Sequence, residues 1–298
     1  MASDRHKKKM ATGDLIFNVI IYTFLALVVI VTLFPFINNL AYSFSNKYSA
    51  VAGGIHLLPR KWTLDNYIVL LKDYPGVRRG LRTSLLRTLL ATPVSLAVNA
   101  LLAFILSRKK YLFKSGFALF WVITMYLQGG IVPTYILYRN LKLTGSFLVY
   151  VIPGLVNVLY VLVLRTYMKN LPESLEEAAQ LEGAGYFRIF TCIVSPLCKP
   201  VYAAIALFIA VYHWNSWFDA LLYNRLVAEL TTVNFEIMKF LSELRHNQKI
   251  DYTIKCRTAT PHTIRSAAIV LAVLPLMTVF PFFQKYFVAG LTVGGIKD

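Results

Sequence analysis

The chain has 298 residues, of which 57% are apolar and 15% are charged, and its formal net charge is +17. Soluble domains average about 45–50% apolar and about 25% charged residues, and the mean hydropathy of this chain is +0.58. The composition excludes an ordinary soluble domain and indicates a membrane protein with several spans. A nucleic-acid-binding protein is also excluded, because the basic residues are spread over the loops without a helix-turn-helix or aromatic-basic sheet pattern.

Six apolar blocks predict an all-α membrane protein with six transmembrane helices, organised as a single polytopic domain over residues 1–298. Each block is about 22–26 residues long, enough to cross a hydrocarbon core of about 30 Å as a helix. The first block is longer than the apolar run of a signal peptide and precedes no small-residue cleavage site, so we expect it to be retained. The blocks are Leu15–Ile37, Thr83–Leu106, Phe113–Tyr138, Phe147–Met168, Pro200–Leu222 and Ile264–Phe287.

Basic residues in short flanking segments predict the orientation of these spans. Lys7, Lys8 and Lys9 precede the first block, and Arg108, Lys109, Lys110 and Lys114 lie in the tight loop after the second. Both segments, and with six spans also the loop 165–199 and the C-terminus, are therefore expected in the cytoplasm. The longer segments 38–82 and 223–263 are then expected to face outward.

The segment between the fourth and fifth blocks is polar at its start and predicts two short helices joined by a turn. Ser174 and Glu177 have the spacing of a capping box. Gly183 is placed as a left-handed helix stop. A face made of Leu175, Ala178, Ala179 and Glu182 follows helical spacing, and a second helix from about Tyr186 carries Phe187, Phe190 and Ile193 before Pro196 and Pro200 turn the chain into the fifth block.

This segment has two possible partners, the lipid surface and another protein. Interfacial helices favour Lys and Arg on their polar face, whereas this segment presents the acids Glu173, Glu176, Glu177 and Glu182. Anionic headgroups would repel these acids. A protein partner is therefore the better interpretation.

The same residues resemble the EAA motif of ABC importer permeases. The match consists of Glu177-Ala178-Ala179, Gly183 six residues after the Glu, and then Ile193, Pro196, Leu197 and Pro200. Two positions depart from the usual pattern: Glu182 stands where Asp is common, and Ser195 where Leu is common. The resemblance covers nearly all of the sequence, and Trp214-Asn215 is similar to the sugar-importer branch, in particular to permeases of complex-oligosaccharide and alginate-type importers.

The resemblance implies a type I ABC importer permease fold with a core at 78–288 and a cytoplasmic coupling loop at 173–200. In such permeases this loop docks on a cytosolic ATPase dimer, which binds the ATP and Mg²⁺; this chain itself would bind no cofactor. The further partners implied are a second, related permease and an extracellular substrate-binding protein, in a bacterial cytoplasmic membrane. The coupling residues implied are Glu177, Ala178, Ala179, Glu182, Gly183, Ala184, Phe187 and Phe190.

No enzymatic site is apparent in the sequence. The chain lacks the G-x-x-x-x-G-K-[ST] phosphate-binding loop, and it shows neither a nucleophile with its base nor paired carboxylates within the spans. Its histidines and cysteines lack metal-ligand spacing. His213, beside Trp214, is expected to be a packed side chain. We therefore expect a transport subunit whose ATP hydrolysis is supplied by a partner.

Polar and aromatic side chains within the apolar blocks are candidates for a substrate pathway, because lipid cannot satisfy polar groups. An alternative remains for several of them: Asn99 and Asn157 would bridge helices, and Trp121 and Trp217 would belong to interfacial belts. The candidates are Asn99, Trp121, Gln128, Asn157, Tyr160, Asn215 and Trp217.

A second class of function is an ion- or proton-driven secondary carrier. Such a carrier would use acids within its spans as relays and would contain an internal inverted repeat. Asp219 is the one acid within an apolar block, close to its end, and no repeat is visible. The ABC permease interpretation is therefore favoured.

Overall fold

The computed structural model describes residues 12–108, 113–127, 129–246 and 259–295. Its regular elements in these ranges are helices, and an isolated antiparallel bridge joins Ser45 and Trp62. The expected all-α class is confirmed. The chain forms two compact units, one made of 1–70 with 249–270 and the other of 71–248 with 271–298. We describe each unit by itself.

The first unit contains α1 (Thr12–Ser43), α2 (Lys47–Ala52), most of α3 (Asp65–Asp73) and the start of α15 (Pro261–Gly295). The fully buried Asn66 ties its connecting segment to the end of α1, because its Nδ2 donates to the carbonyl oxygens of Ser43 and Ser45 at 2.8 and 2.9 Å. Asn38 donates likewise to the carbonyl of Ile55 at 2.9 Å. The segment after the first apolar block is thus held against the end of α1 by hydrogen bonds.

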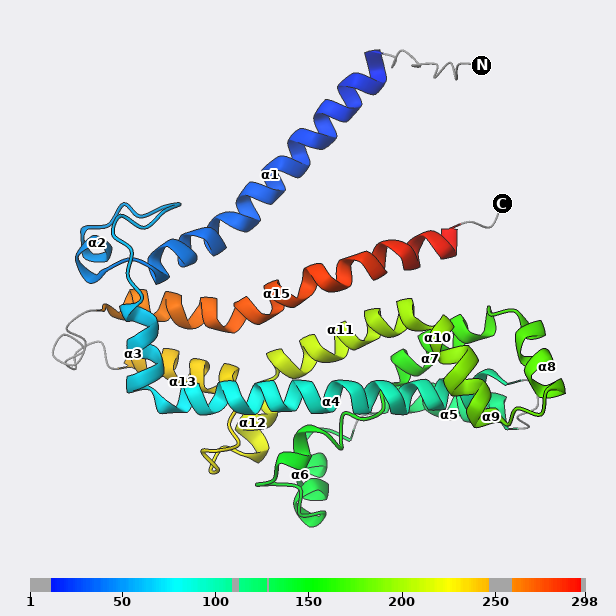
Figure 1. Ribbon diagram of the computed structural model, residues 1–298. Helices are drawn as coiled ribbons and strands as arrows, with labels where there is room; N and C mark the ends of the chain where they lie inside the picture. Colours follow the sequence, from blue (N-terminus) through cyan, green and yellow to red (C-terminus); the bar gives the residue numbers. More distant parts are fainter. Residues whose placement is uncertain (1–11, 109–112, 128, 247–258, 296–298) are drawn as a thin grey trace. The chain divides into compact units, whose positions relative to one another are not determined.

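The second unit is built around α4 (Pro75–Ser107), against which α7 (Val158–Lys169), α11 (Lys199–Asn215) and α13 (Val233–His246) pack (Figure 1). Alanines on α4 allow α7 and α11 to approach closely, and branched side chains of those helices fill the space. The core of this contact contains Ala100, Ala103, Phe104, Val161, Leu164, Ile205 and Ile209.

Three described helical stretches are long and apolar enough to cross a membrane: Ile16–Ser43, Pro75–Ser107 and Pro261–Gln284. Two bent pairs, Gly116–Tyr126 with Ile131–Asn140 and Tyr186–Leu197 with Lys199–Asn215, bring the number to 5 if each pair is one span. The expected count of six spans is not confirmed for the described residues.

The third, fourth and fifth blocks do not form the continuous helices that we expected. The third contains α5 (Lys114–Tyr126) and α6 (Ile131–Asn140), and the fifth contains α11 and α12 (Phe218–Tyr223). In the fourth, a single 3₁₀ turn, η1 (Phe147–Tyr150), is followed by Pro153 and Gly154, and α7 begins only at Val158. In the third and fourth blocks the interruptions contain Gly or Pro, which hydropathy does not register and which interrupt helices because of backbone freedom and a missing N–H donor. The break in the fifth block, at Ser216 and Trp217, contains neither residue.

Candidate functional site

The predicted coupling segment contains a helix, α8 (Glu173–Leu181), that ends in a left-handed turn at Gly183. The φ angle of Gly183 is +77°. Its N–H donates to the carbonyl of Gln180 at 3.0 Å, and the N–H of Ala184 donates to that of Ala179 at 2.9 Å. These two bonds are those of a Schellman motif. The predicted glycine stop is confirmed.

The predicted capping box is wrong. The helix begins at Glu173, one residue before the expected cap, and the cap position is Pro172, whose side chain accepts no hydrogen bond. Ser174 therefore lies inside the first turn. Pro172 fixes an extended backbone that enters the helix directly, and Glu173 and Glu176 supply negative charge at the positive end of the helix.

The second half of the segment is a helix that widens and then bends. It runs through α9 (Tyr186–Ile189), the π-helical η2 (Phe190–Val194) and α10 (Ser195–Leu197). The N–H of Ser195 donates to the carbonyl of Phe190, five residues earlier, and the wider turn precedes Pro196, which has no N–H to donate. The axis then bends by 83° into α11, as the two prolines predicted.

The structure divides the predicted coupling residues into two groups. Ala179, Ala184 and Phe190 pack inward against the core around α4. The exposed group faces away from this core and consists of Glu177, Ala178, Glu182, Gly183 and Phe187. The small side chain of Ala179 thus allows α8 to approach the bundle, and the exposed group is available to a partner.

A cation that the sequence analysis assigned only to a cytoplasmic flank fixes this segment to α4. Arg108 follows the last residue of α4 and forms an ion pair with Glu176. Its guanidinium lies over the ring of Phe104, 4.5 Å from the centroid. Burial lowers the pKa of Arg108 from its ordinary value, and nearby groups, among them Glu173, act in the opposite direction. Because Arg108 is followed by Lys109 and Lys110, the sequence pattern indicated only a basic flank and not an ion pair with α8.

The predicted pathway residues do not gather around one cavity. Asn99 is fully buried and holds the start of α7, because its Oδ1 accepts from the N–H of Asn157 at 2.9 Å. Asn157 in turn caps α7 by accepting from the N–H of Leu159 at 3.0 Å. Trp121 and Tyr160 pack against the core, Asn215 is the exposed last residue of α11, and Gln128 lies outside the described residues.

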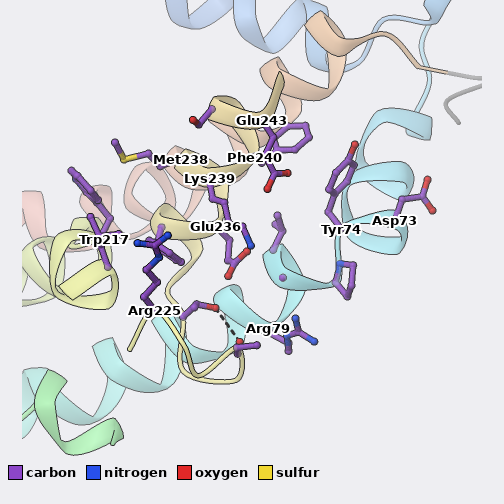
Figure 2. A pocket seen from close by; sticks show the side chains of 18 residues that line it. Asp73, Tyr74, Arg79, Trp217, Arg225, Glu236, Met238, Lys239, Phe240 and Glu243 are labelled. Carbon is purple, nitrogen blue, oxygen red and sulfur yellow. Dashed lines mark hydrogen bonds between the residues drawn. The ribbon is translucent and has the colours of Figure 1, made fainter. Parts of the chain in front are cut away.

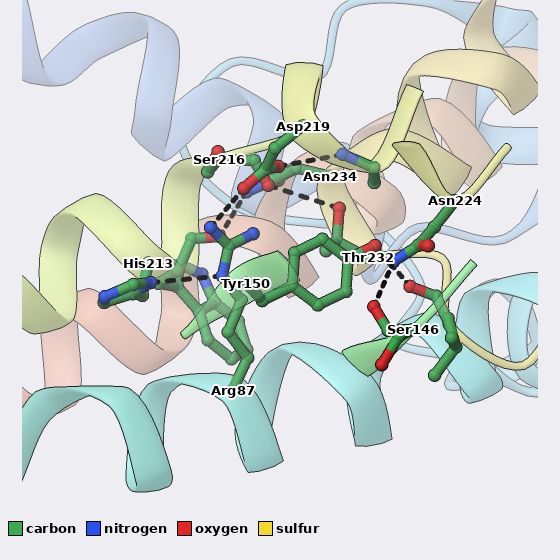
Figure 3. A network of polar contacts seen from close by, with 12 residues as sticks. Arg87, Ser146, Tyr150, His213, Ser216, Asp219, Asn224, Thr232 and Asn234 are labelled. Atoms are coloured by element: carbon green, nitrogen blue, oxygen red, sulfur yellow. Dashed lines mark hydrogen bonds and ion pairs between the residues drawn. The ribbon is translucent and has the colours of Figure 1, made fainter. Parts of the chain in front are cut away.

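A polar network that the sequence analysis missed crosses the second unit at Arg87 (Figure 3). The side chain of Arg87 is 1% exposed; its Nη2 pairs with Asp219, and its Nε donates to Nδ1 of His213 at 3.1 Å. The guanidinium also lies 4.5 Å from the centroid of the Tyr150 ring, whose hydroxyl donates to the carbonyl of Leu230 at 2.5 Å. The network joins α4, η1, α11 and α12.

At the start of α4, opposite the end that carries Arg108, the second unit has a cavity of about 630 Å³ (Figure 2). Trp217, one of the predicted pathway residues, lines it together with residues of α13. Its charged side chains are of both signs: Arg79, Arg225 and Lys239 with Asp73, Glu236 and Glu243. Figure 1 likewise shows α13 at one end of α4 and α8 with α9 at the other.

Known proteins resemble this chain over nearly its whole length, although no protein-family model matches it. It is 30% identical over 291 residues to the polygalacturonan/rhamnogalacturonan transport system permease protein YtcP of Bacillus subtilis, covering 95% of this chain and 98% of that one. It is 30% identical to the probable ABC transporter permease protein PH1036 of Pyrococcus horikoshii, covering 87% and 90%.

A solved structure shares the fold. It is a chain of a bacterial ABC transporter involved in the import of the acidic polysaccharide alginate, with a TM-score of 0.84, 24% identity, and coverage of 93% of this chain and 99% of that one. The sequence relatives carry the family assignment, and the solved structure shows the shared fold. The chain belongs to the permease proteins of ABC transporters.

Proposed function

We propose that this chain is one of two permease subunits of an ATP-driven importer that moves oligosaccharides delivered by an extracellular binding protein. Permeases of this family are transport subunits and not enzymes, so ATP and Mg²⁺ would bind to a partner ATPase. The names of the relatives favour a carbohydrate substrate. The secondary-carrier alternative lacks a free acid for a relay, because Asp219 is paired with Arg87.

The observation that carries this proposal is the exposed turn between α8 and α9. Leu181 is 90% exposed and Phe187 is 74% exposed, on either side of the Gly183 turn. Exposed apolar side chains rimmed by polar ones are typical of protein–protein contact sites. A cavity of about 510 Å³ beside α8 is lined by Glu173, Glu176 and Glu177 together with Arg108 and Lys169, so a partner at this place would meet side chains of both signs. The partner proposed is the cytosolic ATPase.

The topology proposed places this turn in the cytoplasm and the α13 end of α4 outside. α4 is long enough to cross the membrane, and the two regions lie at its opposite ends. The mixed-charge cavity at the start of α4 is then available to the extracellular binding protein. In this arrangement both chain termini are cytoplasmic, in a bacterial cytoplasmic membrane.

Co-purification tests the proposal. A tagged chain, expressed with its neighbouring transport genes, should bring down an ATPase and a second permease in mild detergent. The double variant Leu181→Ser with Phe187→Ser should lose the ATPase and keep the second permease. Leu226→Ser is the matched control, because Leu226 is 96% exposed but lies in the loop after α12. A wild-type chain that brings down no ATPase would contradict the proposal.

A further inference from the structure

The loop that follows α2 in the first unit, residues 53–62, turns back toward α1 (Figure 1). Gly53 and Gly54 begin this return loop with φ angles of +70° and +69°, a backbone region that other residues disfavour. The side-chain amide of Asn38 in α1 then donates to the carbonyl oxygen of Ile55 at 2.9 Å. The return loop is therefore fixed beside α1 at a position before the end of that helix.

The position of Asn38 gives the depth of the return loop in a membrane. Asn38 lies within the apolar stretch Ile16–Ser43, whose 28 residues form a helix about 42 Å long, similar to a bilayer of about 40–45 Å with its headgroups. A hydrocarbon core of about 30 Å then begins about 6 Å inside each end of the stretch. Because a helix rises by about 1.5 Å per residue, Asn38 lies about 7–8 Å from the end at Ser43. The loop thus reaches the boundary between headgroups and acyl chains.

The side chains at the tip of the return loop suit this depth. Ile55 is buried, but the next apolar residues, Leu57 and Leu58, are 59% and 72% exposed. Neighbouring exposed leucines have an unfavourable contact with water, and acyl chains would remove it. The apolar stretch of α1 beside them is exposed as well. The two leucines therefore continue an apolar surface of the kind that faces lipid.

Cations and an aromatic ring follow this tip at the level of the headgroups. Trp62 is exposed and pairs with Ser45 in the antiparallel bridge, just past the end of α1. Arg60 and Lys61 precede it, and both are exposed and form no ion pair among the described residues. Tryptophan is enriched at membrane–water interfaces, and basic residues close to the surface are attracted by anionic headgroups.

The depth of the tip favours lipid over a soluble protein as its partner. The extracellular binding protein approaches from water and would meet the headgroups first, because the loop tip lies about 7–8 Å inside the end of the span. The charge favours lipid as well, since residues 44–64 include Lys and Arg but no Asp or Glu. This charge is complementary to the phosphates of anionic lipids.

We propose that the return loop is a lipid anchor in the outer leaflet of the membrane. Leu57 and Leu58 insert at the boundary between headgroups and acyl chains, and Arg60 and Lys61 bind the phosphates of anionic phospholipids. The anchor holds the outer end of α1 at a fixed depth, because Asn38 ties the loop to that helix. The choice of leaflet rests on the proposed topology, whereas the insertion itself is set by the position of the loop along α1.

The depth of the loop tip in a membrane tests the proposal. The assembled transporter carries a nitroxide label at Leu58→Cys, with its other cysteines replaced, in nanodiscs of phosphatidylglycerol and phosphatidylcholine. Electron paramagnetic resonance measures collisions of the label with oxygen, which concentrates among acyl chains, and with a neutral nickel chelate, which stays in water. Both faces of a nanodisc are open to the chelate, so the result does not depend on the orientation of the chain.

Val51→Cys is the matched control for the depth measurement. Val51 is 75% exposed and lies in α2, which Figure 1 shows past the end of α1. We expect the ratio of oxygen to nickel collisions to be severalfold higher at position 58 than at position 51. Both positions are exposed, so neither label should disturb the fold, and uptake by both labelled transporters should match that of the wild type.

Arg60→Gln combined with Lys61→Gln tests the contacts with phosphate. When phosphatidylcholine replaces all phosphatidylglycerol, the collision ratio at position 58 should fall in a chain that keeps Arg60 and Lys61. In the double variant the ratio should be low in both lipids. Lys72→Gln is the matched control, because Lys72 is exposed but lies in α3, outside the return loop. It should keep the dependence on phosphatidylglycerol.

The outcomes separate the anchor from its alternatives. A ratio at position 58 that is no higher than at position 51 would overturn the proposal. Low collision rates with both reagents would overturn it in favour of a protein surface, such as the second permease, that covers the tip. A ratio independent of phosphatidylglycerol would overturn the role of Arg60 and Lys61. Labelling of Cys192 from either side of the membrane reports the topology separately, so a failed anchor and a wrong topology give different results.

Discussion

Arg108 at the end of α4 and Glu176 in the first turn of α8 form an ion pair that joins the coupling segment to the longest core helix of the second unit. The same guanidinium covers Phe104, whose ring lies 5.1 Å from that of Phe190 in η2. Both halves of the coupling segment therefore meet α4 within one turn. A displacement of α8 by a partner would be passed to α4 through these contacts.

Arg108→Glu should uncouple ATP hydrolysis from transport. The substitution places two carboxylates where an ion pair stood, and the two side chains are only 13% and 18% exposed, so their repulsion should displace α8. We expect uptake in proteoliposomes to fall at least about tenfold, with the complex still assembled. The exchange Arg108→Glu with Glu176→Arg should restore part of the uptake, whereas Arg139→Gln on α6 should leave it unchanged. Failure of the exchange to restore any uptake would mean that Arg108 acts through another contact.

Gly183→Val should abolish coupling without unfolding the bundle. The added Cβ meets no atom within 4 Å, so the cost is that of a β-branched residue at φ +77°, about 1–2 kcal/mol. We expect the turn to open and permease-stimulated ATP hydrolysis to be lost. Gly185→Ala is the matched control, because Gly185 has φ −71° and equally open surroundings. Full ATPase stimulation in Gly183→Val would show that the turn is not needed for coupling.

The Gly183 turn could be predicted from the sequence because its cause is local. A helical pattern followed by Gly-Ala-Gly suffices to place a left-handed stop. The expected cap of the same helix, Ser174, lies two residues after the actual cap, Pro172, because Ser174 matches a capping box and Pro172 offers no side-chain signal. Local spacing therefore gave the two helices and their turn, and the error is confined to the cap.

The contacts that fix the site could not be predicted, because they join residues far apart in the chain. Arg87 lies near the start of an apolar block and Asp219 near the end of another, 132 residues later. A hydropathy profile places both residues at the polar ends of apolar blocks. In the folded chain Arg87 is buried and forms an ion pair with Asp219. The pathway candidates failed to gather for a related reason. Asn99 bonds to the backbone of Leu155 and Asn157, and Asn157 caps its own helix, which spacing cannot reveal.

Gly80→Ala should destabilise the second unit. A Cβ at this position of α4 would lie 2.9 Å from backbone atoms of Thr232 and Val233, which cannot yield as a flexible side chain would. Overpacking of this kind costs about 1–3 kcal/mol. The start of α13 is also bound to α4, because the N–H of Val233 donates to the Ser84 hydroxyl at 2.9 Å. We expect a lower midpoint of thermal unfolding in detergent and weaker stimulation by the binding protein.

Gly116→Ala is the counterpart of Gly80→Ala. Gly116 lies in α5, and a Cβ there would meet no atom within 4 Å. Alanine should stabilise this exposed helical position by up to about 1 kcal/mol. Equal midpoints for the two variants would show that the close approach of α4 to the loop is not maintained in the membrane.

Thiol labelling tests the orientation. Cys192 is exposed on η2 and Cys198 is buried, whereas Cys256 lies in the segment predicted to face outward and outside the described residues. A chain that keeps only Cys192 should react with a membrane-impermeant maleimide in inside-out vesicles. It should not react in spheroplasts, which expose only the outer face of the cytoplasmic membrane. A chain that keeps only Cys256 should react in spheroplasts and not in inside-out vesicles. Both single-cysteine chains carry Cys198→Ala. Because α8, η2 and the Gly183 turn lie on one continuous segment, labelling of Cys192 from outside would place the whole coupling segment on the wrong side for an ATPase and would refute the topology.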